Sequence, residues 1–119
     1  MTFQAFEGNQ KLSEHWVAVP LELVDWMAEK FPTPFLTYLA RLDPYASQKV
    51  REEMVLAAAS ELSRVKEILR DPRQATGVPD RVDLFGVYGL AGAKKTVGEA
   101  IKFFEAAATN NWKVVSIGD

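Results

Sequence analysis

The segment GLAGAKKT, residues 89–96, has the residue types of a phosphate-binding loop: glycines, two lysines and a threonine. A P-loop requires glycine, any four residues and then Gly-Lys-Ser/Thr, because its backbone amides must wrap a phosphate. Here Lys94 stands where the second glycine should be, and only 23 residues follow Thr96 to supply the remaining strands of such a fold. The segment therefore predicts at most a simple anion site at Lys94, Lys95 and Thr96.

Three glycines of the same region, Gly86, Gly89 and Gly92, are spaced three residues apart. On a helix they would form a strip of small residues, and each would cost about 1 kcal/mol relative to alanine. Such a strip needs a packing reason. It predicts the close approach of a second helix, for which the alanines at 57–59 offer a matching surface, or a seam between two copies of the chain.

The other reactive residue types form no catalytic cluster. His15 is the only histidine, and the absence of cysteine excludes disulfides, thiolate metal sites and a cysteine nucleophile. Glu52 and Glu53 are neighbours, so on a helix they point about 100° apart. Glu61 is expected to be solvated or salt-bridged. The sequence thus predicts a protein that is not an enzyme, with no catalytic residue, no metal and no cofactor.

The first third of the chain indicates a different kind of function, the recognition of a basic surface. Glu22, Asp25 and Glu29 fall at i, i+3 and i+7 and therefore share one helix face, with Trp26 beside it. Carboxylates steer a basic partner during encounter, and an aromatic ring anchors the complex. These four residues are the predicted partner-binding site. In the alternative interpretation, Leu23 and Trp26 face a packing partner inside the domain.

Length and composition predict a single globular domain over residues 1–119. The chain is 48% apolar and 25% charged, with a net charge of −2. That acidic balance argues against a nucleic-acid binder. No apolar stretch approaches the roughly 20 residues that span a bilayer, and the first residues lack the pattern of a signal peptide. A cytoplasmic protein without a membrane partner is expected.

The elements that would hold these residues are mostly helical. Segments 15–19 (HWVAV) and 112–117 (WKVVSI) have strand composition and are expected to pair as a small two-stranded sheet. A cap residue followed by proline predicts helix starts at Thr33-Pro34 and Asp43-Pro44. The second of these is expected to open the longest helix, which runs to about Arg70.

The resulting fold class is mainly α (α+β), with four or five helices around that long central helix. Its apolar stripe steps by three and four, as an amphipathic helix requires; it comprises Val55, Ala58, Leu62, Val65 and Leu69. A first helix is expected to start at Pro20 and a last one at Ala93. For residues 82–92 a helix is favoured, and a strand stays open.

In general character the chain resembles the small bacterial immunity proteins, which neutralise toxins delivered between competing cells. The resemblance rests on size, on the acidic face of Glu22, Asp25 and Glu29 with Trp26, and on the closing segment NNWKVVSIGD. It implies a tight complex with a cognate toxin whose active site is occluded. Many such toxins are basic nucleases, which an acidic face would suit. Two other functions stay open: a dimerising secretion chaperone or structural adaptor, and a small-molecule or phosphate-binding enzyme built on Gly89–Thr96.

Overall fold

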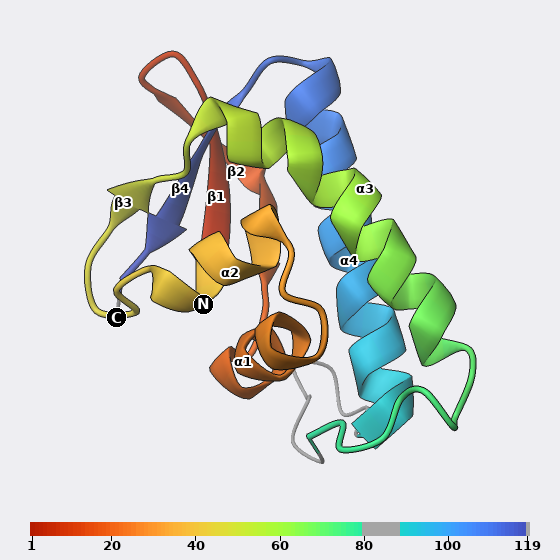
Figure 1. Cartoon of the computed structure of the whole chain (residues 1–119). Coiled ribbons are helices and arrows are strands. Elements are labelled where there is room, and N and C mark those ends of the chain that lie inside the picture. The colour runs from red at the N-terminus through yellow and green to blue at the C-terminus, as the bar shows by residue number, and fades with distance from the viewer. Residues whose placement is uncertain (80–88, 119) are drawn as a thin grey trace.

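The structure, a computed structural model, describes residues 1–79 and 89–118. Within these residues four helices lie on one side of a four-stranded antiparallel sheet (Figure 1). The strands are β1 (Thr2–Glu7), β2 (Gln10–Ala18), β3 (Gln48–Lys49) and β4 (Lys113–Ile117). The helices are α1 (Leu21–Lys30), α2 (Pro34–Arg41), α3 (Glu52–Leu69) and α4 (Gly89–Thr109).

The sheet corrects the predicted fold class, because the protein is α+β with four strands rather than mainly α with two. The strand order is β2-β1-β4-β3, so segments 15–19 and 112–117 do not pair with each other. β1 lies between them and pairs antiparallel with both. Its residues Phe3 and Ala5 are fully buried against the helices. The N-terminal segment, for which no element was predicted, is thus a central strand of the sheet.

The long central helix is also shorter than expected. The chain forms a turn after Asp43-Pro44 and then the short strand β3, so that prediction of a helix start was wrong. Lys49 pairs with Val115, and the next amide, that of Val50, donates to the carbonyl of Val114 at 2.8 Å. Because these bonds require extended backbone, α3 begins only at Glu52. Its predicted apolar stripe is confirmed, since all five residues are buried.

The segment Gly89–Thr96 forms the first two turns of α4 and not a loop. Residues 80–88, with Gly86 and most of the uncertain segment 82–92, lie outside the described residues. α3 and α4 run antiparallel, as Figure 1 shows, so the N-terminal end of α3 lies beside the C-terminal end of α4. The expected match between the glycine strip and the alanines at 57–59 is therefore wrong, because Gly92 lies near the opposite end of α3.

Four phenylalanines at the centre of the molecule join the sheet to the helices. Phe104 of α4 makes edge-on contacts with the rings of Phe3, Phe35 and Phe103, with centroid separations of 5.1–5.4 Å. Such T-shaped pairs add to the stabilisation from burial alone. β1, α2 and α4 are thereby tied to one core, which holds the sheet rigidly beneath the helices.

The N-terminus of α2 is capped from two directions. The Thr33 hydroxyl accepts from the amide of Leu36, and Pro34 has no amide to satisfy, so the predicted start at Thr33-Pro34 is confirmed. Both carboxylate oxygens of Glu61, on α3, accept from the amide of Phe35 at 3.1 and 3.2 Å. Glu61 therefore caps a neighbouring helix, where a solvated or salt-bridged side chain was expected.

Candidate functional site

The side of the sheet opposite the helices carries apolar side chains that no described helix covers. Register places Trp16 of β2, Phe6 of β1, and Val115 and Ile117 of β4 on this side. Trp16 is 53% exposed and the other three are half-buried. We call these four residues, with the lysines described below, the open sheet face. Patches of exposed apolar side chains mark interaction sites more often than single exposed residues do.

An irregularity in β2 lies directly before Trp16. Gln4 pairs with Trp16 and Phe6 pairs with Lys11, so one residue of β1 opposes four residues of β2. The Gln4 amide fills the break, because its Nε2 lies 2.6, 3.2 and 3.1 Å from the carbonyl oxygens of Leu12, His15 and Ala5. Gln4 is buried, and its amide replaces the ladder bonds that the irregular segment cannot make.

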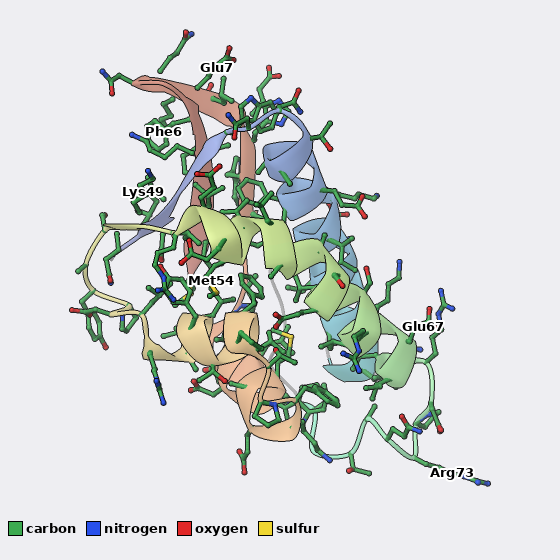
Figure 2. The ribbon with its side chains drawn as sticks, turned by 45° about the horizontal axis from the view of Figure 1, so that its top comes forward. Phe6, Glu7, Lys49, Met54, Glu67 and Arg73 are labelled. Atoms are coloured by element: carbon green, nitrogen blue, oxygen red, sulfur yellow. The ribbon has the colours of Figure 1, made fainter. Side chains whose placement is uncertain are left out.

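The charges at the paired positions of the open sheet face are all positive. Lys11, Lys49 and Lys113 pair with residues of this face, and these pairings include no carboxylate. The Lys113 ammonium lies 5.2 Å from the centroid of the Phe6 ring, in a cation–π contact. Figure 2 shows Phe6 and Lys49 on the side of the strands away from α3 and α4. The face therefore combines aromatic and aliphatic surface with positive charge.

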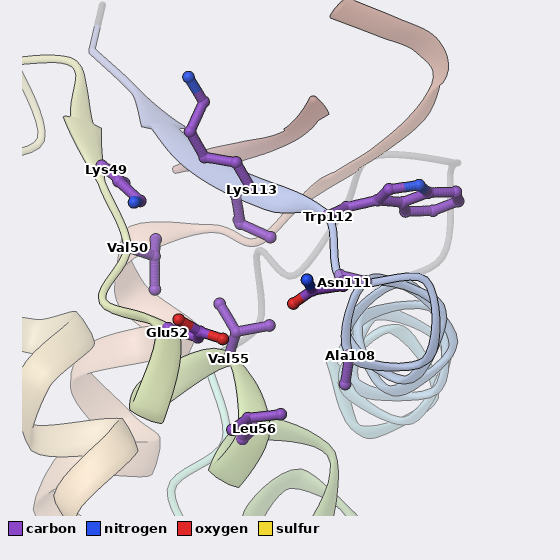
Figure 3. Close-up of a pocket in the computed structure, with 11 residues that line it drawn as sticks. Lys49, Val50, Glu52, Val55, Leu56, Ala108, Asn111, Trp112 and Lys113 are labelled. Carbon is purple, nitrogen blue, oxygen red and sulfur yellow. The ribbon is translucent and has the colours of Figure 1, made fainter. Parts of the chain in front are cut away.

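A pocket of about 200 Å³ adjoins this face where β4 meets the start of α3 and the end of α4 (Figure 3). We call it the α3–β4 pocket. Its apolar lining consists of Val50, Val55, Leu56, Ala107, Ala108 and Val114, and its polar lining of Lys49, Glu52, Asn111 and Lys113, with Trp112 beside them. Lys49 and Lys113 line the pocket, but strand register places their side chains on the open sheet face, on the other side of the sheet from Val50 and Val114.

The predicted acidic face of α1 is present, but Trp26 is not part of it. Glu22, Asp25 and Glu29 are all exposed on the helix. Trp26 is only 8% exposed, and its indole nitrogen donates to the carbonyl of Thr76 at 3.2 Å. The expectation of an aromatic anchor there is corrected in favour of the alternative, in which Trp26 packs inside the domain, because the indole joins α1 to the loop that follows α3. A pocket beside it is lined by Trp26, Glu29, Lys30, Thr76 and Gly77.

The three residues of the predicted anion site lie on different sides of α4. Lys94 and Lys95 are exposed and line a groove between α3 and α4. Thr96 points the other way and is 4% exposed, in the core. The groove also contains Glu67, Glu99 and Glu105, so its charge is mixed. Helical backbone occupies residues 89–96, and the loop geometry that would wrap a phosphate is not formed.

Side chains able to ligate a metal do not converge anywhere in residues 1–79 and 89–118. These residues contain no cluster of three or more His, Asp or Glu side chains that could hold a metal ion. The ring of the exposed His15 lies against that of Trp112, with centroids 4.5 Å apart and the ring planes tilted by 42°. Among the helices described, none is long and apolar enough to cross a membrane.

Comparison with family models, with curated proteins and with solved structures found no match for the chain. The candidate site is therefore the open sheet face with the α3–β4 pocket, argued from geometry alone. The open sheet face was not predicted from the sequence, because it depends on β1, for which no strand was predicted, and on a pairing register that brings distant residues together. One signal was available: TFQAFE alternates apolar and polar residues at its start, with Phe3, Ala5 and Gln4 as a strand would place them.

Proposed function

We propose that this chain is a non-enzymatic protein-binding module that holds its partner on the open sheet face. The observation that carries the proposal is Trp16, a tryptophan 53% exposed and set among Phe6, Val115 and Ile117. Tryptophan is among the residues most enriched at binding hot spots. Covering the exposed half of its surface, about 100 Å², would contribute about 2–3 kcal/mol at 25 cal/mol per Å².

The partner class follows from the resemblance noted above. An immunity protein binds a toxin domain and occludes its active site, and a rigid sheet face with a hot-spot residue is a suitable inhibitor surface. The acidic face of α1 is the competing surface on the same molecule. A basic nuclease would be steered to Glu22, Asp25 and Glu29, whereas the open sheet face, with its lysines, suits a partner with acidic groups around an apolar patch.

The test is an affinity capture of the tagged protein from its native cells, with bound chains identified by mass spectrometry. We expect one stoichiometric partner that is toxic when expressed alone and that the Trp16→Ala variant no longer retains. Tyr45→Ala is the matched control, since Tyr45 is a still more exposed aromatic residue, at 78%, in the turn before β3. Loss of the partner with the double variant Glu22→Lys, Asp25→Lys, but not with Trp16→Ala, would refute the open sheet face as the binding surface.

Self-association is the second candidate, because an uncovered apolar face can also be satisfied by another copy of the chain. Light scattering of the purified protein separates the two functions. A protein that is monomeric from micromolar to millimolar concentrations supports the function of a toxin inhibitor. A concentration-independent dimer that Trp16→Ala converts to monomer supports the function of a dimeric adaptor and refutes that of a toxin inhibitor.

A further inference from the structure

We infer that the outer edge of β2, at Trp16 and Ala18, takes up an extended segment of the protein partner as an additional antiparallel strand. The segment supplies backbone N–H and C=O groups along β2 and places a large apolar side chain next to Trp16. This inference rests on the proposed protein-binding function and specifies how the backbone of the partner is held.

The hydrogen bonds at the start of β1 fix which backbone groups of β2 point outward. The Met1 nitrogen donates to the carbonyl of Val19 at 2.9 Å, and the Val19 amide donates to the carbonyl of Met1 at 2.7 Å. In an antiparallel ladder, such hydrogen-bonded pairs alternate with pairs whose backbone groups point away from each other. Val17 is therefore in the next hydrogen-bonded pair, and Ala18 and Trp16 are not. Their N–H and C=O groups point away from β1.

The same alternation, followed across the sheet, agrees with a bond at its other edge. Gln4 lies opposite Trp16 on one side and Val115 on the other, so its backbone groups face β4. The neighbouring residue of β4, Val114, must then face β3. Its carbonyl accepts from the Val50 amide at 2.8 Å, as the alternation requires. The outward direction of the groups on β2 is thus supported by an independent bond.

The outward groups of Trp16 and Ala18 have no hydrogen-bond partner among the residues that the structure describes. Within those residues β2 pairs only with β1, and no other bond reaches these groups. An edge strand with unpaired groups is a template for pairing with another chain. The opposite edge of the sheet, β3, consists of two residues only, and a short edge strand limits such pairing.

The available edge is short, and its side chains indicate what fits beside it. The register breaks directly before Trp16, and Pro20 has no N–H, so a segment of about five residues covers the edge. Its residues opposite Trp16 and Ala18 lie on the open sheet face, because side chains alternate along a strand. Ala18 is small, which leaves room opposite it for a large apolar side chain in diagonal contact with the exposed indole.

A segment of a partner fits this edge better than a second copy of the chain. Two copies joined through Trp16 and Ala18 would share one short ladder, whereas stable interfaces bury about 1,200–2,000 Å². A partner can bind the edge and the open sheet face together, because Trp16 belongs to both. The edge then aligns the backbone of the partner, and the open sheet face contributes the apolar contacts.

The first experiment is amide hydrogen exchange of the free protein, followed by ¹⁵N–¹H NMR. We expect the amides of Trp16 and Ala18 to exchange about tenfold faster, or more, than that of Val17, which is bonded within the sheet. Slow exchange of both amides in the monomer would overturn the inference, because the edge would already be paired. Slow exchange only where light scattering shows a dimer would also overturn it, in favour of a second copy.

The second experiment is a titration of the whole protein with the probe N-acetyl-Thr-Phe-Thr-Val-Thr-amide, whose phenylalanine and valine would lie opposite Ala18 and Trp16. We expect it to shift the amide signals from Trp16 to Ala18 and to slow their exchange. The probe N-methylated at phenylalanine and valine cannot donate to β2 and should bind about tenfold more weakly, or less.

The matched control is the probe N-methylated at its first and last threonines. Those N–H groups point away from β2, so this probe should bind within about twofold of the unmethylated one. Equal affinities of the two methylated probes would overturn the inference. Absence of binding by the unmethylated probe at millimolar concentration would overturn it as well.

Proline variants test the same edge on the protein. Ala18→Pro removes an outward N–H without breaking a bond to β1, and should lower the affinity for the unmethylated probe about fivefold. Lys49→Pro is the matched control, because it removes an outward N–H from the opposite edge and should leave that affinity unchanged. Urea unfolding reports whether each variant folds, and the methylated probes decide the question where Ala18→Pro does not. A folded Ala18→Pro variant with the affinity of the parent would overturn the inference.

The failure of this inference is distinguishable from the failure of the proposed function. If Trp16→Ala abolishes capture of the native partner but the two methylated probes bind equally, the open sheet face binds the partner without an added strand. If the probes behave as expected and Trp16→Ala has no effect on capture, the edge accepts a strand, but the open sheet face does not hold the native partner.

Discussion

Replacement of Gln4 tests how the open sheet face is built. The Gln4 amide is buried and lies within hydrogen-bonding distance of three backbone carbonyl groups, those of Ala5, Leu12 and His15. Gln4→Ala removes this donor and leaves part of the irregular segment unsatisfied. Each unsatisfied buried polar group costs about 1–3 kcal/mol, and the more exposed carbonyls can turn to water, so we expect a loss of about 2 kcal/mol. This loss is a substantial fraction of the free energy of unfolding of a typical protein, which is about 5–15 kcal/mol.

Gln4→Glu sharpens the test, because it keeps the shape and exchanges a donor for an anion. The pKa of a carboxyl group at this position is raised, because burial and the dipoles of the three nearby carbonyl groups both disfavour the charged form. The folded-state pKa then lies above the unfolded value of about 4.3. Below the unfolded pKa the carboxyl group is protonated in both states and no charge is buried. The free energy of unfolding of the variant then falls as the pH rises through the folded pKa. At pH 7 we expect a loss of roughly 2 kcal/mol beyond that of Gln4→Ala.

The assay is urea unfolding followed by fluorescence of the three tryptophans, at pH 4 and pH 7. Gln10→Ala is the matched control, because Gln10 is an exposed glutamine of β2 and should change stability by less than about 0.5 kcal/mol. The result that would refute the reasoning is a Gln4→Glu variant as stable as Gln4→Ala at pH 7 with no recovery at pH 4. The amide would then not be the donor that joins the two strands.

Other substitutions test the remaining structural assignments by the same assay. Glu61→Ala should cost about 2 kcal/mol, because it removes a charge-assisted bond at a helix N-terminus, whereas Glu67→Ala, in an exposed ion pair, should cost less than about 0.5 kcal/mol. Gly98→Ala should stabilise the protein by about 0.5–1 kcal/mol, since open space surrounds the position in α4, but Gly89→Ala should destabilise it by about 1 kcal/mol because φ is +60° there. Trp26→Phe should cost about 1 kcal/mol through loss of the indole bond to a loop carbonyl, and an unchanged midpoint would contradict that bond.

The sequence predicted the helices well where a local signal dictates the backbone. Thr33-Pro34 marks the start of α2 because the cap and the proline ring act within one turn. The stripe from Val55 to Leu69 is buried because a period of 3.6 residues has few alternative explanations. α4 ends at Thr109, just before Asn110-Asn111, and Asn111 adopts a left-handed conformation that asparagine tolerates better than most residues.

The sequence misled where the decisive contacts are distant. Asp43-Pro44 carries the same helix-start signal as Thr33-Pro34, but pairing with β4 keeps residues 48–49 extended. No local pattern contains that information, because β4 lies more than sixty residues further along the chain. Glu61 likewise reads as a surface residue until α2 folds against α3 and brings an unsatisfied amide to it.

The candidate site was the hardest feature to predict, because its residues come from four strands. Trp16 lies in segment 15–19, which was expected to pair with 112–117, and the observed register with β1 places it on the uncovered side. Trp26 was predicted as a partner anchor beside charged neighbours, and the structure supports the alternative that it packs inside the domain. The loop at 71–79 lies against it and accepts its indole N–H.

The two candidate surfaces are opposite in charge, and that decides how they can be separated. The exposed carboxylates of α1 attract a basic partner, and the lysines of the open sheet face attract an acidic one. Salt weakens both attractions, so a salt dependence of the association rate cannot distinguish the two surfaces. Reversal of the charges on one surface can distinguish them. Lys49→Glu with Lys113→Glu should slow association about tenfold if the open sheet face binds the partner, and should accelerate it if a basic partner binds α1. In stopped-flow measurements, the association rate of this double variant should therefore fall if the open sheet face binds the partner and rise if α1 does. The direction of the change also identifies the charge of the partner.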